Sequence, residues 1–195
     1  MDKFFNSTFD ALTNVVPGSC IIAILFIFDP GIESWGDLVE KLNKIELGSA
    51  AFLVFLSYVF GFAITPMGKF LYTKVGFRLW PLKPSPGQSG LPVSDKFVLV
   101  RQYSPDNFKY IESWNMFCNL AHNLAFSSLV LLLACLYRIV AMGADSAVFS
   151  IIAALSVILF LLFLHRAVVF RIWALNDLNA TVDRLGLMDE LKQTP

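Results

Sequence analysis

Four apolar blocks, separated by charged or Pro/Gly-rich segments, constrain the fold of this chain more than any other feature of its sequence. They cover about residues 12–28, 47–65, 119–137 and 147–164. A helix rises about 1.5 Å per residue, so blocks of this length cross the hydrocarbon core of a bilayer, which is about 30 Å thick. A helix also satisfies its own backbone hydrogen bonds in lipid. The sequence therefore predicts an all-α integral membrane protein, with four transmembrane helices in a single domain over residues 1–195.

The basic residues are divided unequally between the two sides of this arrangement. Twelve of the fifteen lie in the N-terminal tail, the 66–115 segment or the C-terminal tail, and the other three are Lys41, Lys44 and Arg138. Because loops rich in Lys and Arg stay in the cytoplasm, this distribution predicts an N-in/C-in topology, with both termini cytoplasmic. The net charge is zero and the pattern contains no nucleic-acid-binding fold, so we expect no direct contact with nucleic acid.

A long uninterrupted helix is predicted from Ser104 onwards. Ser104 suits the N-cap, Pro105 suits the first turn, and no Pro or Gly follows until Gly143. A helix of about 33 residues is about 50 Å long, which is more than a bilayer needs. Apolar spacing after the fourth block continues to Gly186, a suitable C-cap. We therefore expect the third and fourth helices to form an antiparallel hairpin, joined near Gly143 and extended side by side into the cytoplasm.

Shorter elements are predicted between the blocks. Residues 34–46 place apolar and charged side chains on opposite helical faces, which predicts an external amphipathic helix anchored by Trp35. The segment of about 66–104 is predicted to be a cytoplasmic Pro/Gly loop. We expect Pro66 to end the second span and an interfacial helix to follow over about 67–80. Residues 97–100 have the β-branched pattern of a short strand or of a contact with another chain.

Small residues in the second block indicate where helices approach one another. Ser49, Ala50, Ala51, Ser57 and Gly61 leave room for close backbone contact between membrane helices. We expect Tyr58 and Gly61 to face a neighbouring helix.

Polar side chains at the start of the third block form the best candidate site. Asn115, Asn119, His122, Asn123 and Ser127 recur at helical spacing and are expected to share roughly one face. One interpretation is a proton- or ion-responsive site, because histidine changes charge near neutral pH. The other is a set of hydrogen bonds that holds helices or subunits together. The predicted spans contain no carboxylate to serve as a proton partner, which favours the second interpretation.

Two further sets of residues are candidates for contacts with lipids or proteins. The first consists of cationic side chains beside the predicted spans, which suit anionic lipid headgroups or an acidic partner surface, although ordinary topology-setting charges would look the same: Lys69, Lys74, Arg78, His165, Arg166 and Arg171. The second consists of aromatic side chains on the predicted cytoplasmic rods, which are candidates for docking a soluble partner: Phe108, Tyr110, Trp114 and Trp173.

Motifs for catalysis and metal binding are not found in the sequence. Gly87-Gln88-Ser89-Gly90 is similar to the GxSG of intramembrane serine proteases, but it falls in an aqueous Pro-rich loop. No GxGxxG, Walker or HExxH motif is present, and the three cysteines form no CxxC pair. We expect a non-enzymatic protein with no catalytic residue, cofactor or metal site.

Several features together resemble a class of small bacterial four-span membrane proteins found in antiphage defence operons, and the membrane subunits of Kiwa systems match by length and span count. These features are Val16-Pro17-Gly18 opening the first span, residues 58–61 in the second, the polar start of the third span at 119–123, and the basic-aromatic end of the fourth at 165–173. The resemblance covers the whole chain in outline. It implies a homo-oligomer in the bacterial inner (plasma) membrane that senses membrane disturbance during infection and docks a soluble, DNA-binding effector.

The sequence leaves two functions open. The first is a non-enzymatic, oligomeric sensor subunit that contacts membrane lipids and docks a soluble cytoplasmic partner in antiviral defence. The alternative is a pore-forming effector that depolarises the cell, with Asn119, Asn123, Ser127 and Ser128 lining the pore of an oligomer.

Overall fold

The computed structural model describes residues 2–29, 31–32, 34–142 and 146–186, and every regular element within them is helical. The elements, in order, are α1 (Asp2–Ile27), α2 (Trp35–Asn43), α3 (Leu47–Leu71), the π-helix η1 (Tyr72–Gly76), α4 (Phe77–Leu79), α5 (Val93–Tyr103), α6 (Pro105–Met142) and α7 (Ser146–Arg184). The all-α prediction is confirmed.

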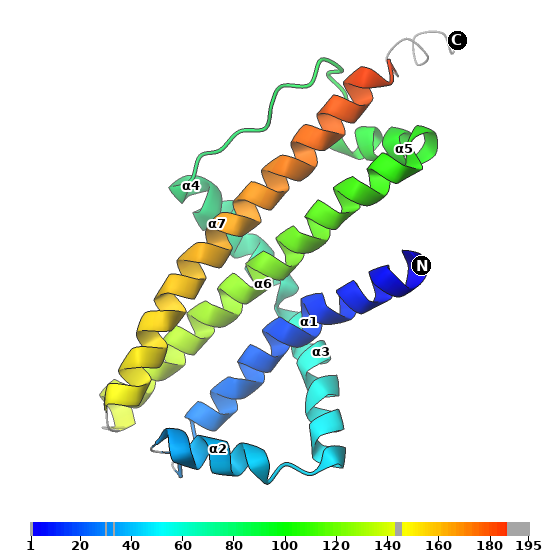
Figure 1. The fold of residues 1–195 in the computed structure, drawn as a ribbon. Coiled ribbons are helices and arrows are strands. Elements are labelled where there is room, and N and C mark those ends of the chain that lie inside the picture. The colour runs from blue at the N-terminus through cyan, green and yellow to red at the C-terminus, as the bar shows by residue number, and fades with distance from the viewer. Residues whose placement is uncertain (1, 30, 33, 143–145, 187–195) are drawn as a thin grey trace.

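The two longest helices, α6 and α7, lie side by side and antiparallel along their whole length (Figure 1). Ser104 separates α5 from α6, and its carbonyl oxygen accepts the Phe108 N–H at 2.9 Å as the first bond of α6. Buried side chains form one cluster around Ala121 and Leu164 and a second around Ile111 and Leu178. The predicted hairpin of extended helices is therefore present, while the predicted turn at 143–145 lies outside the described residues.

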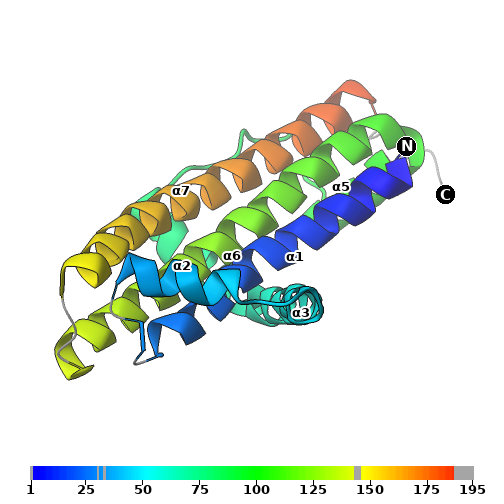
Figure 2. The same ribbon diagram turned by 60° about the horizontal axis from the view of Figure 1, so that its bottom comes forward.

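The N-terminal helices pack differently, because α3 crosses the others steeply instead of lying along them. In Figure 2, α3 is seen nearly end-on while α1, α6 and α7 run across the picture. Only Ser57, Gly61 and Gly68 of α3 are buried. A Cβ added to Gly61 would lie 1.9 Å from the Asn14 carbonyl oxygen, and one added to Gly18 would lie 1.7 Å from that of Ser57. The expectation that this face meets a neighbouring helix is thus correct for Gly61 and wrong for Tyr58, which is 38% exposed.

The helix predicted over about 67–80 is present, but two other expectations for the segment after Pro66 are wrong. Helix α3 does not stop at Pro66 but runs on through η1 and α4 to Leu79, because proline removes only one N–H while the backbone on both sides keeps packing. Residues 97–100 are not a strand but part of α5, since burying Val100 against α6 and α7 outweighs local β-propensity. Most of the predicted 66–104 loop is therefore helical, and residues 80–92 and Ser104 are irregular.

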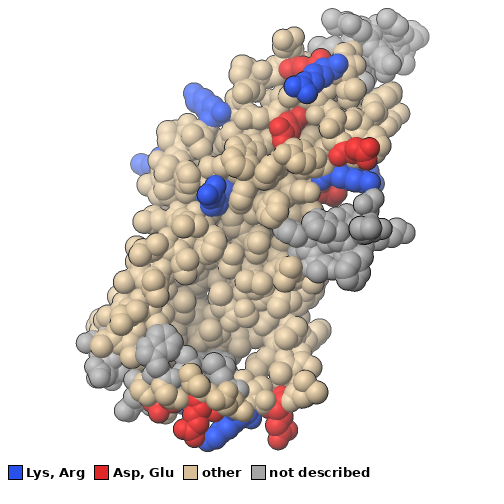
Figure 3. Space-filling view, viewed as in Figure 1, with Lys and Arg blue, Asp and Glu red and all other residues tan. Residues whose placement is uncertain are grey.

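Within the residues that the structure describes, three helical runs are long and apolar enough to cross a membrane: Leu47–Leu79, Pro105–Ala141 and Ala147–Arg184. The apolar stretch of α1, Ala11–Leu25, is shorter. On the face drawn in Figure 3, charged side chains gather at the end that carries α2 and over the opposite part, with an uncharged band between them. The chain is a helical, multi-pass membrane protein by these criteria. The fourth span and the N-in/C-in orientation stay predictions.

Candidate functional site

Helices α1, α3 and α6 meet at a buried polar junction formed by Asn123 and Ser127 of α6. The Asn123 Nδ2 donates a hydrogen bond to Thr65 Oγ1 of α3 at 3.0 Å. The Ser127 hydroxyl lies 3.0 Å from the carbonyl oxygen of Pro17 in α1 and 3.0 Å from that of Asn123. Ser127 is fully buried and Asn123 nearly so. Each side chain therefore connects α6 to a different neighbouring helix.

His122, on the same turn of α6, is only 1% exposed. Its ring stacks on Tyr72 of η1 with a centroid distance of 5.2 Å and an angle of 7° between the planes. The His122 Nε2 lies 3.2 Å from Asn119 Oδ1. An amide oxygen only accepts hydrogen bonds, so Nε2 is the donor in this contact. The His122 ring therefore donates within its own helix, to Asn119.

Gly68 of α3 closes this junction. A Cβ added to Gly68 would lie 2.7 Å from His122 Nδ1 and 3.0 Å from Asn123 Oδ1. Neither of these two atoms has a conventional hydrogen-bond partner among the described residues. A glycine Cα–H takes the place of the Cβ, and Cα–H···O contacts are a recurring feature of close helix crossings. Gly68 therefore permits the close approach of α3 to α6, and its Cα faces the His122 Nδ1 and the Asn123 Oδ1.

The residues of the predicted polar face do not form one site, because they contact different helices. His122, Asn123 and Ser127 belong to the junction with α1 and α3. Asn115 faces α7, where its Oδ1 accepts from Arg171 Nη1 at 2.9 Å. Asn119 is exposed. The predicted set thus joins α6 to three helices. The partners of this set on the other helices were not predicted from the sequence: Thr65, Tyr72, Gly68 and Pro17. The spacing offers a signal for Gly68, which follows Gly61 by seven residues and so lies on the same face of α3.

The predicted docking aromatics lie where α6 and α7 extend beyond the apolar blocks. Trp114 stacks on Phe170 at 5.9 Å and donates from Nε1 to Asp177 Oδ2 at 2.9 Å, so it packs between the two helices. Tyr110 is 56% exposed and Trp173 is 40% exposed. Phe108 is half-buried, 6.3 Å from the ring of Phe97 in α5. Of the four, only Tyr110 and Trp173 offer a broad free surface.

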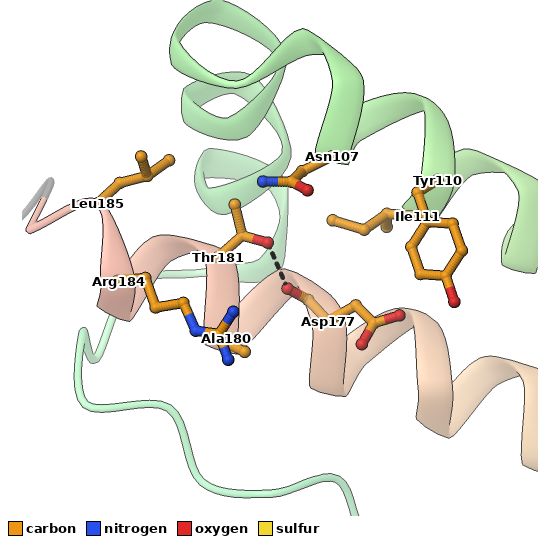
Figure 4. Close-up of a pocket in the computed structure, with 8 residues that line it drawn as sticks. All are labelled: Asn107, Tyr110, Ile111, Asp177, Ala180, Thr181, Arg184 and Leu185. Atoms are coloured by element: carbon orange, nitrogen blue, oxygen red, sulfur yellow. Dashed lines mark hydrogen bonds between the residues drawn. The ribbon is translucent and has the colours of Figure 1, made fainter.

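A polar groove of ≈ 430 Å³ adjoins Tyr110 near the end of these helices (Figure 4). It combines the carboxylate of Asp177 with the guanidinium of Arg184, and the Thr181 hydroxyl donates to the Asp177 carbonyl oxygen at 2.7 Å. Its remaining lining residues are Asn107, Ile111, Ala180 and Leu185. The groove presents both charge signs beside an exposed aromatic ring, a combination suited to a protein surface.

A side-chain ladder on α7 holds the irregular segment 81–92, and sequence reasoning missed it. The Ser85 N–H donates to Asn176 Oδ1 at 2.7 Å, and the Gln88 N–H donates to Asp183 Oδ1 at 3.1 Å. Asn179 donates to the Ser85 carbonyl oxygen at 2.8 Å and accepts from Lys96 Nζ at 2.7 Å. These positions on α7 recur every three or four residues, which is the signal that a sequence search would need.

The six predicted cationic residues do not form one cluster. Four are exposed: Lys69, Lys74, Arg78 and Arg166. His165 packs edge-on against Trp80 with a centroid distance of 5.1 Å, and Arg171 is held by Asn115. Only part of this set is available for headgroups or for a partner.

A charged connection at the opposite end of the molecule was also missed. Arg138 lies inside α6, is 3% exposed and donates from Nη2 to the Ile32 carbonyl oxygen at 3.2 Å. Nearby, Lys41 of α2 pairs with Asp29. The hydrogen bond from Lys41, and then that from the Gly31 N–H, lowers the pKa of Asp29. These contacts tie the segment after α1 to α2 and α6.

No family model, curated protein or solved structure matches this chain. Within the described part of the chain, no group of three or more His, Cys, Asp or Glu residues is placed to hold a metal ion. The fold and its junctions define the class as a helical multi-pass membrane protein with a paired extension of two helices.

Proposed function

We propose that this chain is a non-enzymatic, oligomeric subunit of the bacterial inner membrane that senses a membrane disturbance and docks a soluble partner in antiviral defence. The observation that carries the proposal is the surface at the end of the α6–α7 pair. There Tyr110 and Trp173 are exposed, and a groove with both Asp177 and Arg184 lies beside Tyr110. Exposed aromatics and arginine are the residues that dominate binding at protein interfaces.

The length of α7 supports docking away from the membrane. The last apolar block ends near residue 164, and α7 continues to Arg184. Twenty further residues extend a helix by about 30 Å. A partner bound at Arg184 would thus sit clear of the headgroups of the bilayer.

The exposure of α3 supports the sensing role. Only 11% of the most apolar 18 residues of the Leu47–Leu79 run are buried, so lipid would surround most of this helix. Its run continues through η1 and α4 to Leu79, and the segment that follows is bound to α7 by Asn176 and Asn179. A change in bilayer thickness would tilt α3, since helices adapt to hydrophobic mismatch by tilting. The bound segment would pass that tilt to α7.

The alternative function, a pore, would require buried hydrogen bonds between helices to break. Asn123 and Ser127 would have to leave their bonds to Thr65 and Pro17 before they could line a channel. These side chains already join α6 to α1 and α3, so we prefer the sensor to the pore.

The test is native mass analysis of the protein extracted from its own host in mild detergent, with Tyr110→Ala and Trp173→Ala variants. Tyr137→Ala is the matched control, because Tyr137 is 55% exposed at the other end of α6. We expect an oligomer that carries a stoichiometric soluble chain in the wild type and the control, and at least about a tenfold loss of that chain in the two variants. A bare oligomer in the wild type would refute docking and lead to conductance measurements.

A further inference from the structure

A second groove, ≈ 290 Å³ in volume, lies between α6 and α7 and is apolar apart from one cation. Its sides include Leu124 of α6 and Leu162 of α7 at one end, and Phe117 and Phe170 at the other. Ala121 contributes only a methyl group between these larger side chains, which leaves the space open. Arg166 is the cation at its edge.

The groove runs from the apolar blocks to their boundary. Leu124 and Leu162 lie inside the blocks, while Arg166 and Phe170 follow residue 164, where the last block ends. The eight residue-to-residue steps from Leu162 to Phe170 cover about 12 Å of helix. The Phe117 and Phe170 rings close the boundary end at a centroid distance of 5.5 Å. An occupant would therefore have its apolar part in the membrane and its polar part beside Arg166.

Arg166 differs from its cationic neighbours. Arg171 donates to Asn115 and His165 packs against Trp80. Arg166 is exposed, and the described part of the chain gives its guanidinium no hydrogen bond or ion pair. A planar guanidinium with free donors binds phosphate through two parallel hydrogen bonds.

We propose that this groove binds one anionic phospholipid, with an acyl chain between Leu124 and Leu162 and the phosphate on the Arg166 guanidinium. The apolar walls select a lipid over free phosphate, and a net negative headgroup is favoured over a zwitterionic one because no acidic side chain lines the groove. The site rests on the membrane class of the chain and not on the docking of a soluble partner.

The test is native mass spectrometry of delipidated, detergent-solubilised full-length protein titrated with dioleoylphosphatidylglycerol or dioleoylphosphatidylcholine. Arg166→Gln removes the phosphate ligand, and Lys83→Gln is the matched control, an exposed cation outside the groove. Leu162→Trp fills the groove from its exposed side, and Leu161→Trp, also exposed but outside the lining, is its control. Circular dichroism checks that each variant remains helical.

We expect one phosphatidylglycerol per chain to be retained about tenfold more than phosphatidylcholine. That preference should fall about tenfold in Arg166→Gln and total retention should fall in Leu162→Trp, with both controls unchanged. Equal retention of the two lipids by the wild type would overturn the proposal, as would equal losses in a variant and its control. Displacement of the lipid by inorganic phosphate at the same concentration would also overturn it, because the apolar groove would then contribute nothing.

Discussion

Replacing Gly61 by alanine tests the crossing of α1 and α3. An added Cβ would lie 1.9 Å from the Asn14 carbonyl oxygen, whereas ordinary contacts begin at 3.4 Å. The two backbones would have to separate by about 1.5 Å, since both atoms in contact belong to rigid helix and neither is the end of a flexible side chain.

The magnitude follows from two opposing terms. Overpacking a tight contact costs about 1–3 kcal/mol. Alanine is a better helix former than glycine and returns about 0.5–1 kcal/mol. The difference between the two terms is about 0–2.5 kcal/mol, so we expect Gly61→Ala to lower the free energy of unfolding by about 1 kcal/mol. Gly48 of the same helix has nothing within 4 Å of its added Cβ. Gly48→Ala should accordingly be neutral or more stable by up to about 1 kcal/mol.

The assay is reversible unfolding of the detergent-solubilised protein by increasing SDS, followed by tryptophan fluorescence. Both variants are measured beside the wild type in the same micelles. If Gly61→Ala proves as stable as Gly48→Ala, the close contact between α1 and α3 at Gly61 is refuted.

Three further outcomes are expected. Ser127→Ala removes the hydrogen bond from α6 to α1 and should cost about 0.6–1.7 kcal/mol in the same assay; no change would mean that the bond contributes nothing. Asn176→Ala should speed hydrogen exchange at the Ser85 amide about tenfold, because that N–H loses its acceptor; an unchanged rate would argue against the ladder. Asp29 has a lowered pKa because of Lys41, so its stabilisation is complete above about pH 3.9 and fades as pH falls through its folded pKa. The difference in thermal midpoint between wild type and Asp29→Asn should therefore be constant from about pH 7 to 5 and shrink below about pH 4, and a difference that persists in acid would contradict this.

The long helices could be predicted from the sequence because their signals are local. Ser104, Pro105 and a run without Pro or Gly predict the start and continuity of α6, and the structure extends it to Met142. Pro66 misled the prediction, because a proline ends a helix only when the freed backbone lacks other support. Val100 misled it as well, since its burial against α6 and α7 is a tertiary effect that four residues cannot reveal.

The polar site could be predicted only in part, and helix geometry explains why. An i, i+4 series advances about 40° per step around a helix of 3.6 residues per turn. From Asn115 to Ser127 the three steps add up to about a third of the circumference. Asn115 consequently faces Arg171 of α7, while Ser127 faces Pro17 of α1. Their partners come from other helices, so spacing along α6 alone could not identify them.

The two kinds of helix contact suit different roles in the proposed sensor. Helices α6 and α7 share a continuous interface and would move as one unit. Helix α3 is held at separate points, with Ser57 and Gly61 against α1 and Gly68 against α6. A helix held at points pivots at a lower cost than one packed along its length, because fewer contacts break. Tilt of α3 in the bilayer would thus disturb fewer contacts than separation of α6 from α7, and the segment bound by Asn179 would carry that tilt to α7.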